Sequence, residues 1–139
     1  MKIIPRSCPG CEIRVGRLLT DFNNWKRSIK NYINYTEEVN VIIKFIDREK
    51  SLGRVVYEKG EIEIDPRFTL LQLRNTLVHE LIHYEQYREK ILEIKNDEWF
   101  WKGKKYDNSL VYEEYTNLPW EIEARKRSKK IIDKLFKIY

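Results

Sequence analysis

The segment 69–90 constrains the fold of this chain more than any other stretch, because its apolar residues recur at helical spacing. They follow one another at steps of three and four residues and therefore lie on one side of an α-helix: Leu70, Leu73, Leu77, Leu81 and Tyr84. Asp65-Pro66 ends the preceding strand, because proline cannot continue a ladder of strand hydrogen bonds. We therefore predict a long helix that begins near Thr69 and continues to about Lys90.

The motif His79-Glu80-Leu81-Ile82-His83 lies in the middle of this helix. A spacing of four residues puts both imidazoles on one face, near enough to bind one metal ion. Glu80 lies about 100° further round the helix, so its carboxylate can reach a metal-activated water without binding the metal. Zinc is the usual ion for such ligands in a site that keeps one position open. We therefore expect one Zn²⁺ ion held by His79 and His83, with Glu80 as the base that takes the proton of the water.

The third metal ligand cannot be a histidine, because the chain has 2 histidines and both are in the motif. It must be Glu, Asp or Cys, or be absent. Glu121 and Glu123 stand at the start of a later predicted helix, where Pro119 suits the first turn. These two acids are about 200° apart on a helix, so they cannot easily face the same ion.

The two helices together resemble the gluzincin peptidases, in which a helix after the zinc helix supplies a glutamate. In its small size the chain is most similar to the minigluzincins, single-domain relatives of membrane-embedded zinc peptidases. The residues Glu121-Ile122-Glu123-Ala124 match the Glu-x-x-Ala step of related families, which favours Glu121 as the ligand and leaves Glu123 as the alternative. The resemblance spans about residues 60–139. It implies a zinc-dependent endopeptidase that cleaves extended or unfolded polypeptides. It also implies that the enzyme can be made as a latent zymogen.

The chain departs from the resembled families at one position. Several of them place Asp after the Ala or Ser, where it orients a zinc-bound histidine, whereas this chain has Arg125. The sequence therefore does not identify a residue that orients either imidazole through a hydrogen bond. It also leaves no histidine to stabilise the oxyanion. Tyr112 and Tyr115 are our candidates for that role, and the alternative is that both are packing aromatics.

The remaining patterns predict an α+β fold, a single zincin-like domain over residues 1–139. Apolar residues at helical spacing over 18–33 indicate a backing helix. Residues 91–117 show no clear period and are predicted to be an irregular loop before the C-terminal glutamate helix. Segments rich in β-branched residues predict a small three-stranded sheet, formed by residues 39–46, 54–57 and 61–65.

The third predicted strand alternates strictly, so Ile62 and Ile64 face the core while its acids face water. We predict that this strand, 61–64, is an edge strand and forms one wall of the substrate cleft, because an extended peptide can add to an exposed sheet edge. The alternative is an ordinary edge strand that its charges protect from aggregation.

Cys8-Pro9-Gly10-Cys11 is a lone Cys-x-x-Cys motif. No second pair exists to complete a structural zinc site. We favour a local disulfide or an inert free pair. A second hypothesis is latency, in which residues 1–15 act as a pro-segment and a thiolate of Cys8 or Cys11 occupies the open position of the zinc.

The net charge of +5 arises largely near the C-terminus, in residues 125–130. We interpret this cluster as a solvated helix face, so we expect a peptide or protein substrate and no nucleic acid. No apolar run could cross a bilayer and the N-terminus is unlike a signal peptide, so we expect a cytoplasmic protein without a membrane partner. The alternatives to a peptidase are a catalytically silent zinc-binding or regulatory module on the same scaffold, and a nucleic-acid-associated protein with a structural zinc.

Overall fold

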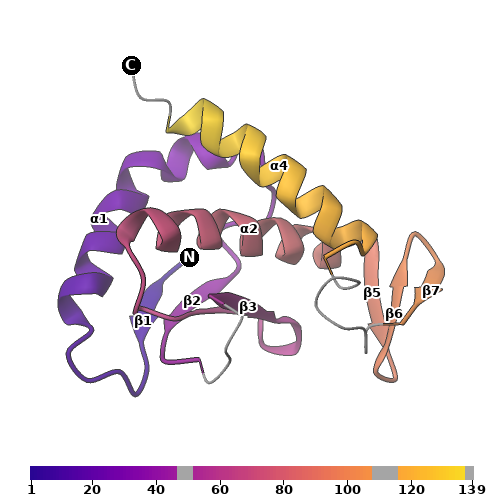
Figure 1. Ribbon diagram of the computed structural model, residues 1–139, viewed down its shortest axis with the longest axis horizontal. Helices are drawn as coiled ribbons and strands as arrows, with labels where there is room; N and C mark the ends of the chain where they lie inside the picture. Colours follow the sequence, from indigo (N-terminus) through magenta and orange to yellow (C-terminus); the bar gives the residue numbers. More distant parts are fainter. Residues whose placement is uncertain (47–51, 108–115, 137–139) are drawn as a thin grey trace.

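The computed structural model describes residues 1–46, 52–107 and 116–136. Its elements confirm the predicted α+β class (Figure 1). The helices are α1 (Glu12–Ile29), α2 (Leu70–Arg88), α4 (Pro119–Leu135) and the short 3-10 helix η1 (Tyr57–Lys59). The strands are β1 (Ile3–Pro5), β2 (Asn40–Ile43), β3 (Gly53–Val56), β4 (Glu61–Ile64), β5 (Leu92–Lys95), β6 (Glu98–Trp101) and β7 (Lys104–Tyr106).

The first sheet has the strand order β1-β2-β4-β3. Strands β1, β2 and β4 are parallel, and β3 pairs antiparallel with β4 at the edge of the sheet. β1 is a strand in addition to the three that we predicted. It was not predicted because three residues are too few to show a period. The prediction that 61–64 is an edge strand is wrong, because β4 lies between β2 and β3. Alternation reports which face of a strand is buried and carries no information on its number of neighbours.

One acid of β4 does not face water as the alternation predicted. Glu63 is only 6% exposed. Its carboxylate pairs with Arg54 of the neighbouring strand β3 and lies 3.6 Å from Nζ of Lys44. The two cations compensate its burial, which an isolated carboxylate could not tolerate.

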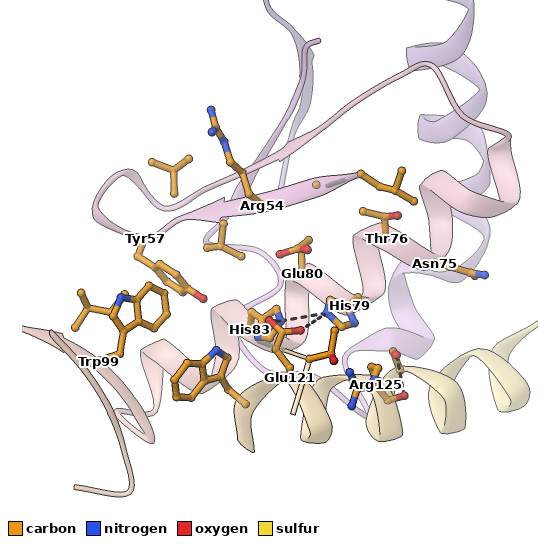
Figure 2. A pocket seen from close by; sticks show the side chains of 18 of the residues that line it. Arg54, Tyr57, Asn75, Thr76, His79, Glu80, His83, Trp99, Glu121 and Arg125 are labelled. Carbon is orange, nitrogen blue, oxygen red and sulfur yellow. Dashed lines mark hydrogen bonds and ion pairs between the residues drawn. The ribbon is translucent and has the colours of Figure 1, made fainter. Parts of the chain in front are cut away.

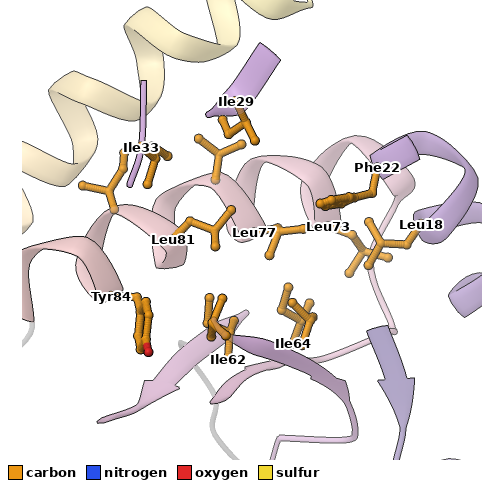
Figure 3. Packing of buried hydrophobic residues seen from close by; sticks show 14 of the residues in the cluster. Leu18, Phe22, Ile29, Ile33, Ile62, Ile64, Leu73, Leu77, Leu81 and Tyr84 are labelled. Atoms are coloured by element: carbon orange, nitrogen blue, oxygen red, sulfur yellow. The ribbon is translucent and has the colours of Figure 1, made fainter. Parts of the chain in front are cut away.

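Helix α2 lies at the centre of the molecule, between the first sheet and the other helices (Figures 1 and 3). Its leucines meet Ile62 and Ile64 of β4 and the apolar side of α1. α4 packs on α2 and also contacts α1. Because α2 is covered on several sides, it buries residues around most of its circumference, including polar ones. Leu70 is 37% exposed, contrary to the expectation, because it is the first residue of the helix.

The start of α2 is fixed by a capping box. The Thr69 hydroxyl accepts a hydrogen bond from the backbone N–H of Gln72, and the Gln72 side chain accepts one from the backbone N–H of Thr69. This reciprocal pair satisfies two of the free donors of the first turn. The predicted start near Thr69 is thus confirmed. None of the described helices combines the length and apolarity that crossing a bilayer requires.

The prediction of an irregular loop over 91–117 is wrong for its first half. β5, β6 and β7 form an antiparallel sheet joined by two-residue turns. The turn residues Asn96, Asp97, Lys102 and Gly103 all have positive φ, as hairpins of this kind require. The strands are too short to show a period. Trp99 of β6 stacks on Trp120 of α4, with ring centroids 5.6 Å apart, which holds this second sheet against the C-terminal helix.

Candidate metal centre

Three potential ligand atoms converge between α2 and α4 (Figure 2). The Nε2 atoms of His79 and His83 lie 3.1 Å apart. Nε2 of His79 lies 3.4 Å from Oε2 of Glu121, and Nε2 of His83 lies 3.1 Å from Oε1 of the same carboxylate. The four-residue spacing in α2 therefore places both imidazoles toward the first turn of α4.

These separations match the size of a zinc ion. Donors at about 2.0–2.2 Å from a tetrahedral ion lie about 3.3 Å from one another. The two Nε2 atoms lie 3.1 Å apart, and each lies 3.1 or 3.4 Å from the nearer of the two Glu121 oxygens. Two imidazoles and one carboxylate are also a ligand set that catalytic zinc sites use. The three residues thus fit a metal ion with the ligand preferences of zinc.

Glu123, the alternative ligand, does not join this cluster. Its carboxylate accepts a hydrogen bond from Nε2 of Gln86 at 3.3 Å and lies 3.4 Å from Nη1 of Arg127. Glu121 and Glu123 are about 200° apart on a helix, so only one of them can face the histidines. The packing of α4 turns Glu121 toward them. Of the two predicted candidates, the structure brings only Glu121 to the histidines.

Burial and charge act in opposite directions on the cluster. Burial raises the pKa of Glu121, but the hydrogen bonds and charges of His79 and His83 outweigh it and hold that pKa well below its usual range. Burial lowers the pKa of His83, but the hydrogen bond and charge of Glu121 outweigh it and raise the pKa to about 9. Glu121 is therefore ionised at neutral pH, the form in which a carboxylate binds a metal.

Gln86 orients one of the imidazoles, a role that the sequence motif does not contain. Its Oε1 lies 2.8 Å from Nδ1 of His83, and its Nε2 donates to the backbone carbonyl of Trp120 at 3.1 Å. Because the amide is held by α4, it presents its oxygen to Nδ1–H, so that Nε2 is the nitrogen that carries the lone pair once the ring is neutral. The available signal was the position of Gln86 three residues after His83, on the same helical face.

Glu80 is 9% exposed and lines the same pocket as the two histidines. Burial raises the pKa of its carboxyl, the charges of His83 and His79 oppose that shift, and the charge of Glu121 adds to it. A carboxylate with a raised pKa is a stronger base. Glu80 thus has the position and the basicity to accept a proton beside the cluster.

The pocket has a volume of about 1230 Å³ and lies between β3, α2, α4 and the hairpin of β5 and β6. The predicted cleft wall at 61–64 does not line it, and the edge strand β3 does. Gly53 lets this strand approach α2: a Cβ there would lie 2.7 Å from Cγ2 of Thr76 and 3.5 Å from Cγ of Glu80. The half-exposed edge beside the cluster can accept an extended peptide.

The other predicted site residues do not enter the described part of this pocket. Cys8 and Cys11 form a disulfide at the start of α1, are 8% and 3% exposed, and are not among the residues that line the pocket. Their role in latency stays a prediction. Tyr112 and Tyr115 lie outside the described residues, so their proposed contact with the oxyanion also stays a prediction.

Comparison with known proteins bears on the fold. No protein-family model and no curated protein matches the sequence. The chain is similar to the crystal structure of a mutant of Wss1 from Saccharomyces cerevisiae, with a TM-score of 0.55 and 13% sequence identity over 100% of this chain and 95% of that chain. At this identity the likeness concerns the fold alone. The chain thus shares its fold with Wss1, and it carries a His-His-Glu cluster that could hold a metal ion.

Proposed function

We propose that this protein is a zinc-dependent endopeptidase of the gluzincin type, which hydrolyses peptide bonds of extended or unfolded polypeptides. One observation carries the proposal: the Nε2 atoms of His79 and His83 lie 3.1 Å apart, and each lies within 3.4 Å of an oxygen of the Glu121 carboxylate, which is close to the donor spacing of about 3.3 Å around a tetrahedral zinc ion. The buried carboxylate of Glu80 in the same pocket supports it, as does the zinc-protease-like fold.

Each residue of the cluster has a distinct task in this proposal. Nε2 of His79, Nε2 of His83 and a carboxylate oxygen of Glu121 would hold the ion. When bound, zinc would supply a Lewis acid that lowers the pKa of a water and polarises a carbonyl. Glu80 would accept the proton of that water and pass it to the leaving amine. Gln86 would keep the lone pair of His83 on Nε2.

The edge strand β3 would hold the substrate. All four of its residues are half-buried and line the pocket, and its outer edge has no neighbouring strand within the described sheet. A peptide that pairs with this edge adopts an extended conformation. An extended or unfolded polypeptide has its backbone N–H and C=O groups free for such pairing, which is why we propose this class of substrate.

The test compares zinc content and hydrolysis of an unfolded protein substrate in the parent and in Glu80→Gln. We expect the parent to bind one zinc ion and to hydrolyse the substrate. Glu80→Gln should retain zinc and lose about 100- to 10,000-fold in rate, the usual contribution of a general base. Glu58→Gln is the matched control, because Glu58 lines the same pocket but is exposed and stands outside the cluster.

Three results would contradict the proposal or part of it. A parent protein that binds no zinc would remove the metal centre. A parent protein that binds zinc but hydrolyses none of several unfolded substrates would leave the alternative, a catalytically silent zinc-binding or regulatory module. Equal losses in Glu80→Gln and Glu58→Gln would show that Glu80 has no special role.

A further inference from the structure

Arg125 brings a positive charge to the pocket. It is exposed, it lies on α4 one helical turn after Glu121, and it lines the pocket (Figure 2). Within the described part of the chain its guanidinium has no hydrogen bond or ion pair. The other arginine lining the pocket, Arg54, pairs with Glu63. Among the described residues, Arg125 is therefore the lining arginine without an ion pair, and its guanidinium can meet a ligand.

The two ends of the pocket differ in character. Tyr57 and Trp99 lie at one end and Arg125 at the other, with the His-His-Glu cluster between them (Figure 2). The acids Glu58 and Asp97 also line the pocket, next in sequence to Tyr57 and close in sequence to Trp99. They would disfavour a substrate carboxylate at the aromatic end. The pocket thus has an acidic aromatic end and a basic end.

The direction of β3 relates these ends to the direction of a bound peptide. β3 begins at Gly53, beside Thr76 of α2, and is followed by Tyr57, whose ring lies 4.8 Å from that of Tyr87 in the last turns of α2. Antiparallel pairing is the more stable arrangement of strands. A peptide paired in this way with β3 begins at the aromatic end and continues toward Arg125.

We propose that Arg125 binds a carboxylate on the part of the substrate that follows the scissile bond; this inference rests on the proposed function. Arg125 is four residues from Glu121, about 6 Å along the helix, which corresponds to about two residues of an extended chain. The carboxylate is therefore that of an Asp or Glu side chain in the first two residues after the bond, or a C-terminal carboxylate there. The planar guanidinium suits either, since it can donate two parallel hydrogen bonds to a carboxylate.

The experiment uses two pairs of peptides with the same scissile bond. The first pair carries Glu or Gln in the two positions after the bond, with an amidated C-terminus. The second pair is neutral and ends two residues after the bond, with a free or an amidated C-terminus. We expect the parent to favour the carboxylate member of at least one pair in kcat/KM, and the pair that shows the preference identifies the source. Glu placed before the scissile bond should bring no preference.

Arg125→Gln should reduce that preference by roughly three- to tenfold, the value of a partly exposed charge-assisted pair. Arg125→Lys should restore part of it, because the charge returns without the fork of the guanidinium. Lys126→Gln is the matched control: it removes the same charge from the next position of α4, is exposed, and does not line the pocket. It should keep the preference of the parent.

An equal preference in the parent and Arg125→Gln would overturn the inference, and so would an equal loss in Lys126→Gln. Measuring peptide binding to zinc-loaded Glu80→Gln distinguishes a failure of this inference from a failure of the proposed function. If the parent cleaves both members of each pair equally and binding shows no preference, the role of Arg125 fails and the peptidase stands. If nothing is cleaved but binding retains the Arg125-dependent preference, the peptidase fails and the carboxylate site stands.

Discussion

Oε1 of Gln86 lies 2.8 Å from Nδ1 of His83. Gln86 follows His83 by about one turn of α2. The amide is held in this orientation by the backbone carbonyl of Trp120, which accepts from its Nε2 at 3.1 Å. The first turn of α4 therefore contributes to the site twice, through the side chain of Glu121 and through the backbone before it. A metal ion held by this cluster would therefore couple its binding to the packing of α4 on α2.

Gln86→Ala is expected to weaken zinc binding by about 10- to 100-fold, because the tautomer and the ring orientation of His83 are no longer fixed. Competition with a chromophoric chelator measures the affinity. Gln72→Ala is the control, since it removes the other glutamine of α2, from the capping box. It should lower the thermal stability and leave the zinc affinity unchanged. Unchanged affinity in Gln86→Ala would show that the contact does not support the centre.

Glu121→Gln and Glu123→Gln form a matched pair on α4. Glu121→Gln should lose at least about tenfold in zinc affinity, because a neutral amide replaces the anionic ligand. Glu123→Gln should keep the affinity of the parent, since its carboxylate contacts Gln86 and Arg127 instead of the histidines. The same chelator competition measures both. The opposite pattern would assign the ligand to Glu123.

The metal-free protein, prepared with a chelator, should lose stability as the pH rises above neutral. The pKa of His83 is raised in the fold from 6.5 to about 9. Its contribution is therefore complete below pH 6.5 and is lost as the pH rises through about 9. The pKa of Glu121 is lowered from 4.5, so its contribution is present above that pH and is lost at more acidic pH.

Urea unfolding of the metal-free protein at pH 6 and at pH 9, roughly the two ends of this range, measures the effect. The midpoint should be lower at the higher pH. His83→Gln, which cannot titrate, should show a smaller difference between the two conditions. An equal difference in both proteins would mean that other groups cause the pH dependence.

Gly53→Ala should destabilise the protein by roughly 1–3 kcal/mol, the usual cost of overpacking. A Cβ at this position meets Thr76 at 2.7 Å, so β3 must move away from the helix that carries Glu80, and hydrolysis should fall as well. Gly16→Ala is the control: it lies inside α1 with nothing within 4 Å, and alanine there should stabilise by about 0.5–1 kcal/mol. Chemical unfolding measures both, and a tolerated Gly53→Ala would contradict the close approach.

Cys8→Ser/Cys11→Ser should cost about 2 kcal/mol of stability, the loop-closure value for so short a loop. It should leave hydrolysis no faster than in the parent, because the pair does not line the pocket. Unfolding midpoints and initial rates at equal zinc content provide the measurements. Faster hydrolysis by the variant would instead support the latency hypothesis.

The sequence by itself determined the features that depend on local spacing. The helix α2, its start at Thr69 and the common face of His79 and His83 follow from the 3.6-residue period and from capping chemistry. Pro119 likewise indicated the start of α4. These features are encoded within a few residues of one another, so no knowledge of distant neighbours is needed.

Only the tertiary structure decided which residues from separate elements meet. It turned Glu121 rather than Glu123 toward the histidines, placed Gln86 against α4, and made β3 instead of β4 the edge beside the site. The period of a segment reports which of its faces is buried and carries no information on what covers that face. Strand order, the rotation of each helix and the second sheet depend on packing between residues far apart in the sequence. The candidate metal centre and its pocket depend on the same long-range packing.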